Sequence, residues 1–213
     1  MYIPPHFQCT EQDVYELLNS IGAVDLITFG DGVLEATFMP MLYERDIGRH
    51  HGVLKGHLAR ANPHVKRMSD AESLVIVHGV DSYISPSYYP SKVQHHKVVP
   101  TWNYLVVHIY GDVIIHDDPI WLAKNVRELT NKYELSQSLP WSVDDAPPNY
   151  IEAMLKQIVG VEMIVNRIEA KSKMSQNRSL EDVTGVISGL IAAGNSAGAD
   201  AVRHANDDST RTV

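Results

Sequence analysis

The sequence predicts an α+β fold that is mainly β, built as a barrel of consecutive strands with peripheral helices. Three observations support this class. Residues up to about 116 form short β-type runs separated by tight turns, which is typical of a barrel and not of alternating strand–helix units. Helical apolar spacing dominates only after Pro119. The 44% hydrophobic and 21% charged content is ordinary for a soluble globular domain.

The first elements are a helix and a β-hairpin. Apolar residues recur at helical spacing between a capping Thr10 and Gly22, so a helix is expected there. Val24–Phe29 and Val33–Met39 have the composition of strands. The dipeptide Asp31-Gly32 lies between them, and Asp-Gly is a strong signal for a tight hairpin. The two runs are therefore expected to pair.

The middle of the chain predicts further strands at Val53–Ala59, Leu74–Val77, Val80–Ser85, Thr101–Tyr110 and Val113–His116. Gly79 separates the second of these from the third, and Gly111-Asp112 turns the chain between the last two. Both faces of Thr101–Tyr110 are largely apolar, so this strand should be central. Asn62-Pro63 opens a short helix, because proline is favoured at the first helical position.

The second part of the chain is more helical. Helices are expected at Pro119–Tyr133, Pro148–Ile158 and Leu180–Ala193, with a strand at Gly160–Ala170. From Gly194 the residues are small and polar with no apolar period, which predicts a mobile tail over residues 194–213. No linker-like stretch divides the remainder, so residues 1–193 are expected to form one domain.

Charge, cysteine and histidine content argue against several classes of partner and site. The net charge is −8 and the pI about 5.7, which argues against DNA as the main partner, since DNA binding needs a basic face. The single Cys9 cannot form an internal disulfide. Adjacent histidines such as His95-His96 lack the spacing of a zinc helix, and no metal site is expected. Without a signal peptide or membrane-spanning run, a cytoplasmic protein is the simplest reading.

The segment from Tyr83 to Tyr104 holds the most functional information, because it combines hydroxyls, aromatics and prolines with few charges. Prolines fix its backbone, so its side chains lose little entropy on binding a ligand. The residues that suit a phosphorylated ligand are Ser85, Ser87, Tyr88, Ser91 and Lys92, with Arg60 and Asn62 from another strand end. A proline-shaped turn with solvated serines explains the same residues equally well.

Two further groups of residues are candidates for a planar ring. Thr101, Trp102 and Asn103 could cover a ring and bond its heteroatoms, although aromatic residues on strands are more often core. Ser175, Gln176, Asn177 and Arg178 follow a strand and precede a helix. Their amides could read the edge of a heterocycle, and a helix-capping loop around Asn177 or Ser179 is the alternative.

The chain carries no sign of a catalytic nucleophile. It contains no GxSxG, no Walker loop and no GxGxxG. The adjacent carboxylates Asp117-Asp118 and Asp144-Asp145 are expected to be turn and cap residues and not an acid–base pair. Catalytic residues are therefore not assigned.

Several segments in order resemble the PaiB family, described as FMN-binding negative transcriptional regulators. The matching stretches are MYIPPHF, GHLARANP, YISPSYYPSK, KVVPTWNY, PWSVDDAP and KMSQNRSLEDVTGVISGL, which together span about residues 1 to 190. The resemblance implies an FMN-binding split β-barrel and a homodimer with FMN in a groove between the subunits.

Carried onto this chain, the resemblance makes Arg60, Ser91 and Lys92 candidates for the FMN phosphate. It places Ser85, Ser87 and Tyr88 along the ribityl chain and the ring edge, and Thr101, Trp102 and Asn103 at the ring, with Ser175–Arg178 reaching in from the partner subunit. It also implies negative regulation of transcription, direct or indirect. An FMN-dependent oxidoreductase that also takes a nicotinamide nucleotide is the alternative.

Overall fold

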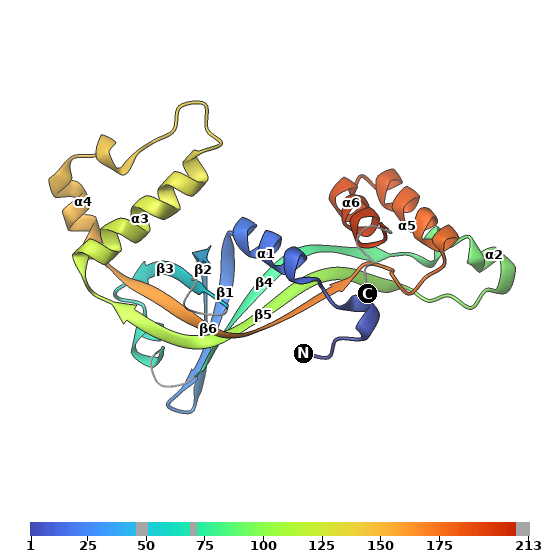
Figure 1. Cartoon of the computed structure of the whole chain (residues 1–213), viewed down its shortest axis with the longest axis horizontal. Coiled ribbons are helices and arrows are strands. Elements are labelled where there is room, and N and C mark those ends of the chain that lie inside the picture. Colours follow the sequence, from blue (N-terminus) through green and yellow to red (C-terminus); the bar gives the residue numbers. More distant parts are fainter. Residues whose placement is uncertain (46–50, 69–71, 208–213) are drawn as a thin grey trace. The chain divides into compact units, whose positions relative to one another are not determined.

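The computed structural model describes residues 1–45, 51–68 and 72–207. Its strands are β1 (Ala23–Gly30), β2 (Val33–Glu44), β3 (Val53–Ala59), β4 (Ser73–Ile84), β5 (Thr101–His116) and β6 (Ile158–Lys173). Its helices are α1 (Glu11–Ser20), α2 (Ser91–His95), α3 (Pro119–Glu134), α4 (Pro148–Leu155), α5 (Leu180–Ala192) and α6 (Ser196–Ala205). Short 3₁₀ turns are η1 (Pro5–Phe7), η2 (Pro63–Arg67), η3 (Pro86–Tyr88) and η4 (Val143–Asp145). Figure 1 labels the helices and strands.

The strands follow one another around a closed barrel in the order β1-β2-β3-β6-β5-β4. Strand β1 pairs antiparallel with β2 and β4, and β3 pairs antiparallel with β2 and β6. The β1–β2 hairpin turns where the sequence predicts it, with positive φ angles of 52° at Asp31 and 75° at Gly32. Two successive positive φ angles define the turn that suits the twist of paired strands. The predicted barrel with peripheral helices is confirmed.

Two predicted strand breaks are wrong, because β4 runs through Gly79 and β5 runs through Gly111 without a turn. A Cβ added at Gly79 would lie 2.8 Å from the side chain of Leu105. A Cβ at Gly111 would overlap the carbonyl oxygen of Ile164. These glycines therefore allow a neighbouring chain to approach closely inside the sheet, and that need cannot be told from a turn in the sequence.

The chain divides into two compact units, where the sequence predicts one domain over residues 1–193. The first unit holds residues 1–14, 78–107 and 169–213, and the second holds 15–77 and 108–168. Three long strands, β4, β5 and β6, contribute residues to both units. The division therefore falls inside strands, and no polar or glycine-rich linker marks it in the sequence.

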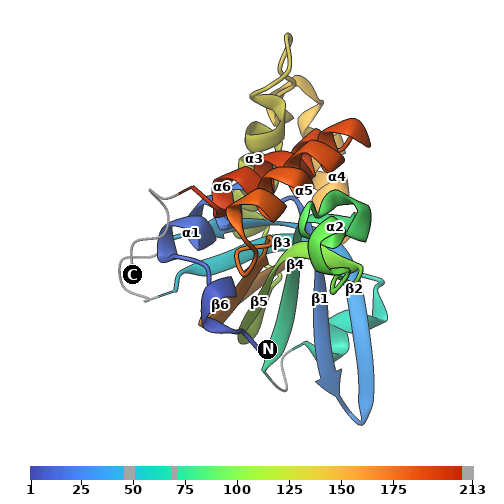
Figure 2. The same cartoon turned by 90° about the vertical axis from the view of Figure 1, so that its right-hand side faces the viewer.

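In the first unit, α5 and α6 lie side by side over one face of the strands (Figures 1 and 2). Their buried cluster consists of Ile84, Tyr89, Met174, Val183, Val186, Leu190, Ala199 and Val202. The 3₁₀ turn η3 packs against α5 at Gly185 and Gly189, where an added Cβ would overlap the backbone and ring of Tyr88. The two glycines thus let the chain around Tyr88 lie directly on the helix.

The predicted mobile tail is wrong for residues 196–205, which form α6. Asn195 caps this helix by accepting a hydrogen bond from the Gly198 N–H at 2.8 Å. Ala199 and Val202 are buried in the cluster under the helix. Such a short apolar stripe among small residues gives little periodic signal, so tertiary packing decides the structure here. Residues 208–213 of the predicted tail lie outside the described residues.

In the second unit, α3 packs against β3 and α4. A buried histidine holds the hairpin to η2. His64 is 2% exposed, and its ring nitrogens lie 2.7 Å from the hydroxyls of Thr28 on β1 and Thr37 on β2. Burial lowers the pKa of His64, which fits a neutral ring that donates one hydrogen bond and accepts the other.

Candidate functional site

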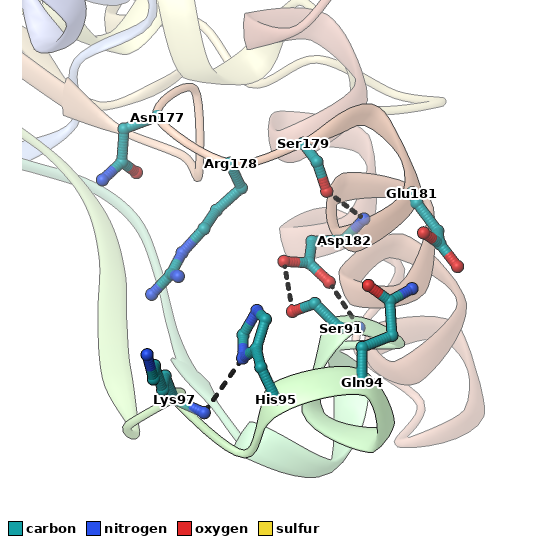
Figure 3. A pocket seen from close by; sticks show the side chains of 9 residues that line it. All are labelled: Ser91, Gln94, His95, Lys97, Asn177, Arg178, Ser179, Glu181 and Asp182. Atoms are coloured by element: carbon teal, nitrogen blue, oxygen red, sulfur yellow. Dashed lines mark hydrogen bonds between the residues drawn. The ribbon is translucent and has the colours of Figure 1, made fainter.

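An open pocket of about 470 Å³ lies in the first unit, between α2 and the start of α5. It is lined by Ser91, Gln94, His95, Lys97, Asn177, Arg178, Ser179, Glu181 and Asp182. Three of these, Ser91, Asn177 and Arg178, are predicted site residues that the fold brings together from distant parts of the sequence. Figure 3 shows the side chains around the opening.

A buried carboxylate joins the two walls of this pocket. Asp182, 4% exposed, accepts hydrogen bonds from the Ser91 N–H at 3.1 Å and the Ser91 hydroxyl at 2.8 Å. Its own N–H donates to the hydroxyl of Ser179, the N-cap of α5, at 3.2 Å. The Ser91 hydroxyl is therefore already committed to Asp182 and fixes α2 to α5.

Arg178 brings to the pocket a positive charge that packs on an aromatic ring. Its guanidinium carbon lies 4.7 Å from the ring centroid of Tyr89, which is 2% exposed and whose pKa is raised by burial. In Figure 3 the Arg178 side chain extends toward His95 and Lys97. Within the described ranges, neither Arg178 nor Lys97 forms an ion pair with a carboxylate. The positive end of α5 borders the same opening and adds to these two positive charges, whereas Glu181 and Asp182 bring two carboxylates to the lining.

The loop before α5 is held by its own polar side chains. Ser175 is 4% exposed, has a positive φ of 69°, and accepts a hydrogen bond from the Asn103 amide at 3.0 Å. The Gln176 side chain accepts from the Met174 N–H at 2.6 Å and donates to the Ser172 carbonyl at 2.7 Å. Asn103, Ser175 and Gln176 thus shape the loop that presents Asn177 and Arg178.

The serines of the η3 turn bond to each other. The hydroxyls of Ser85 and Ser87 are 2.8 Å apart, and the Ser85 hydroxyl also accepts from the Ser87 N–H at 3.2 Å. The ring of Tyr88 packs on Gly189 of α5. Lys92 is exposed and does not line the pocket. Contact of these residues with FMN stays a prediction, and their visible role is to build the turn.

Residues 101–103 point to opposite faces of β5. Asn103 is 1% exposed and faces the interior, whereas Trp102 is 54% exposed. The Thr101 hydroxyl accepts a hydrogen bond from the Lys173 ammonium at 2.5 Å, and the Trp102 carbonyl accepts a second one. The structure therefore does not bring Trp102 and Asn103 to one face, and a ring on either face would meet only one of them.

Arg60 and Asn62 belong to the second unit, where each has local partners. The Arg60 guanidinium pairs with Asp117, and it donates to the carbonyls of Lys156 at 3.0 Å and Ile158 at 2.9 Å. The Asn62 side chain accepts from the His64 N–H at 3.0 Å and so caps η2. A phosphate at Arg60 would have to replace Asp117. Phosphate binding by these two residues stays a prediction.

Six residues of the pocket were not predicted: Gln94, His95, Lys97, Ser179, Glu181 and Asp182. One signal for them exists, because Gln94–Lys97 continues the polar segment that begins at Ser91. Asp182 gives no such signal, since an acidic residue in the first turn of a helix is common for reasons of the helix dipole alone.

The paired carboxylates have the structural roles that the sequence predicts. Asp118 caps α3 by accepting from the Ile120 N–H at 3.1 Å, and Asp117 pairs with Arg60. The two carboxylate oxygens of Asp144 accept from Arg127 at 2.7 and 2.8 Å, and Asp145 completes a capping box with Ser142.

Burial raises the pKa of the Cys9 thiol to about 12, so little of it is a thiolate at neutral pH. In the described part of the chain, no three His, Cys, Asp or Glu side chains gather as a metal site would require. Across those same residues, we find no helix with the length and apolar character needed to cross a membrane.

The solved structures that this fold resembles define its class. A flavocytochrome, Anf3, of Azotobacter vinelandii superposes with a TM-score of 0.60 at 13% identity, covering 83% of this chain and 74% of that one. A protein of Mycobacterium smegmatis titled as FAD and heme binding gives a TM-score of 0.56 at 12% identity, covering 83% and 78%. At such identities the likeness shows the fold alone, and the fold is that of the split-barrel proteins.

Sequence comparison gives the family. A family model described as "Putative FMN-binding domain" matches residues 1–167. This chain belongs to that FMN-binding family, and the prediction of FMN as its cofactor is confirmed at this level.

Individual relatives agree with this assignment. The protease synthase and sporulation protein PAI 2 of Bacillus subtilis is 34% identical over 195 residues, which are 89% of each chain. An uncharacterised protein of Emericella nidulans is 37% identical over 175 residues, which are 70% of each chain. The resemblance to the PaiB family is confirmed.

Proposed function

We propose that the pocket between α2 and α5 holds the phosphate of FMN. The observation that carries this is Arg178, a guanidinium supported on the Tyr89 ring and without a carboxylate partner among the described residues. Lys97 lines the same opening, and Asn177 and Ser179 add polar groups to it. A phosphate monoester near neutral pH carries almost two negative charges and suits such a set of donors.

One residue of the pocket opposes this binding. Glu181 is exposed at the rim, and its carboxylate would repel a phosphate. The second carboxylate, Asp182, already accepts two hydrogen bonds from Ser91. The donor set therefore fits a phosphate, at an affinity that Glu181 reduces.

The test is a titration of the full chain with FMN, followed by tryptophan and flavin fluorescence. Arg178→Ala should weaken binding by about 30-fold, because a charged hydrogen bond to the phosphate is lost. Arg60→Ala is the matched control, since its guanidinium is committed to Asp117 and two carbonyls. It should change the dissociation constant by about twofold at most. Equal losses in both variants, or none in either, would refute the placement of the phosphate.

We further propose that the protein acts as a cytoplasmic homodimer that represses transcription, directly or through a partner. The support is the similarity to the B. subtilis protein over 89% of both chains, since the name of that protein refers to protease synthesis and sporulation. The formal charge of −8 favours an indirect effect on DNA. Light scattering of the purified chain tests the dimer. Transcript levels in a strain carrying the Arg178→Ala variant test whether flavin binding matters to regulation.

An FMN-dependent oxidoreductase is the second candidate. It is favoured by the exposed rings of Tyr83 and Trp102, which leave aromatic surface open on the first unit. Anaerobic mixing of the FMN-loaded protein with NADH or NADPH should then bleach the flavin absorbance. An unchanged spectrum with both reductants argues against this candidate and leaves the regulator as the favoured function.

A further inference from the structure

The second unit carries an exposed apolar segment that the proposed flavin site does not use. We call it the arm, and it comprises residues 135–155, with the loop after α3, the turn η4 and helix α4. Figures 1 and 2 show that the loop of the arm points away from the strands of its unit. Exposed apolar clusters mark contact surfaces. The large apolar side chains on the arm are exposed as follows: Leu135 by 82%, Leu139 by 89%, Trp141 by 45%, Tyr150 by 55% and Met154 by 44%.

Helix α4 is not held by burial of its own side chains. The structure describes all eight of its residues, and its packing against α3 leaves none of these side chains buried. A helix of this length is marginal in water unless one of its faces packs on a neighbour. Tyr150 and Met154 are four residues apart, so they lie on the same face of the helix, and both are exposed. This face therefore has the composition of a buried surface but no cover within one chain.

The loop of the arm is fixed by polar contacts. The guanidinium of Arg127 donates to both carboxylate oxygens of Asp144, at 2.7 and 2.8 Å. The Trp141 N–H donates to the Glu134 carboxylate at 2.8 Å. The ordered backbone thus presents the side chains of Leu139 and Trp141 to solvent. A surface that is ordered before binding loses little conformational entropy when a partner covers it.

The β1–β2 hairpin also has exposed apolar side chains, but it does not need a partner in order to be held in place. Phe29, Leu34 and Phe38 are 59%, 69% and 71% exposed. On the opposite face of the same strands, Leu26 and Met39 are buried in the core. Helix α4 has no such buried face. The arm is therefore the apolar surface whose own order requires a cover.

The arm is large enough for a stable contact with a second copy of the chain. At about 200 Å² for each large side chain, its five exposed apolar residues present roughly 600 Å². Exposed loop residues adjoin them at Ser136, Gln137, Ser138 and Pro140. A stable protein–protein contact buries about 800 Å² per partner. Two arms that face each other therefore come to the area that a dimer requires.

The charge of the arm also suits a contact with its own copy. In a two-fold contact a patch faces the same patch of the second chain, so unpaired charges on it would repel each other. Residues 135–143 contain no charged side chain. Beside them, Arg127 pairs with Asp144, and on α4 Glu152 pairs with Lys156. A partner recognised by charge would find no complementary group on this loop, so the composition favours a second copy.

We propose that the arm binds the arm of a second copy of this chain, with Leu139 and Trp141 near the two-fold axis. The contact gives α4 the apolar cover that it lacks in one chain, since it buries the face with Tyr150 and Met154. The inference rests on the homodimer proposed above, because it names the surface through which that dimer forms. It does not rest on the flavin site, because the arm shares no residue with the pocket at Arg178.

Analytical ultracentrifugation of the full chain over a concentration series measures the self-association. Leu139→Glu places a charge opposite its own copy and should raise the dimer dissociation constant at least about 30-fold. Leu139→Met keeps the apolar area and should associate like the parent. Ile191→Glu, at a 54% exposed residue of α5, is the matched control and should leave the dissociation constant unchanged. A circular dichroism melt checks that each variant is folded.

A second measurement locates the contact on the arm. In a chain with Cys9→Ser, Ser138→Cys places the only cysteine on the loop of the arm. A short bismaleimide should link it to its copy and give a covalent dimer on a denaturing gel. Cys9→Ser with Ser188→Cys, at an exposed residue of α5, is the control and should stay largely monomeric. Adding Leu139→Glu to the Ser138→Cys variant should abolish the link.

The outcomes separate the arm contact from the homodimer itself. A parent chain that stays monomeric up to about 0.1 mM refutes both. A dimer that survives Leu139→Glu unchanged refutes the arm contact and leaves the homodimer. Loss of the dimer in Phe38→Glu but not in Leu139→Glu would assign the contact to the hairpin face and overturn the inference.

Discussion

Two arginines, Arg60 in the second unit and Arg178 in the first, are both predicted site residues, Arg60 for a phosphate and Arg178 beside a planar ring. The fold gives them different partners. Arg60 donates to one carboxylate and two backbone carbonyls. Arg178 lies on an aromatic ring and lines an open pocket. The difference teaches that residue type marks where an anion could bind, and that the partners already present decide where it can.

The largest expected effect tests whether the polar segment around Arg60 is structural. His64→Ala should lower the free energy of unfolding by about 3 kcal/mol, because two buried hydrogen bonds and much of a side chain are lost. Urea denaturation followed by circular dichroism measures this. The control Lys66→Ala, at an exposed residue of the same turn η2, should differ little from the parent. If His64→Ala lost FMN affinity without losing stability, the segment around Arg60 would bind the ligand and would not be merely structural.

The next effect concerns the pocket itself. Asp182→Ala should lower the free energy of unfolding by about 2 kcal/mol, since Ser91 loses both of its bonds to the carboxylate. It should also weaken FMN binding, because α2 is no longer fixed to α5. Asp182→Asn keeps one acceptor oxygen, so it should lose less stability and less FMN affinity than Asp182→Ala. Thermal melts measure the stability of the two variants, and FMN titrations measure their affinity. Unchanged FMN binding in Asp182→Ala would show that the pocket does not need this carboxylate.

A smaller effect is expected from pH. Burial lowers the folded-state pKa of His64 below its ordinary 6.5, with Glu35 opposing and Arg67 reinforcing the shift. Below pH 6.5 the unfolded chain takes up a proton that the folded chain refuses. Stability should therefore be complete above pH 6.5 and fall by up to about 1.4 kcal/mol per pH unit down to the folded pKa.

The pH effect is isolated by difference. The stability of the parent minus that of His64→Gln, measured by urea titration from pH 5 to 7.5, should change in this window and stay level above it. A difference that falls as the pH rises would have the wrong sign and would show that His64 is charged in the folded protein.

The smallest effect is expected at the rim of the pocket. Glu181→Gln removes an exposed carboxylate that lines the pocket together with Arg178, and it should tighten FMN binding about two- to threefold. The gain should shrink as salt is added, because an exposed charge is screened. Glu152→Gln, an exposed carboxylate on the second unit, is the control and should leave the affinity unchanged. Weaker binding in Glu181→Gln would mean that the ligand at this site is not an anion.

The sequence predicted those parts of the fold that local chemistry determines. Asp31-Gly32 can hardly be anything other than a hairpin turn, and the bounds of β3 at Val53–Ala59 follow from its composition. The strand breaks predicted at Gly79 and Gly111 are wrong because the atoms that require glycine lie on a neighbouring strand. The helix α6 was missed because its stability comes from burial of Ala199 and Val202 and not from its own pattern.

The candidate site was predictable only in part, for the same reason. Ser91, Asn177 and Arg178 stood out by residue type, and they line one pocket. Asp182 could not be found, because its role depends on a contact with Ser91 across 91 residues of chain. The sequence likewise does not show that Arg60 pairs with Asp117 while Arg178 faces an open pocket, because both depend on contacts made only in the folded chain.

The two glycines of α5 couple the local stability of the two walls of the pocket. Gly185 and Gly189 each weaken the helix by about 1 kcal/mol relative to alanine, so α5 is a poor helix by itself. Their contact with the chain around Tyr88 restores the order of both segments. The walls of the pocket should therefore exchange their amide hydrogens as one cooperative unit, and a ligand that bridges α2 and α5 should slow the exchange of both together.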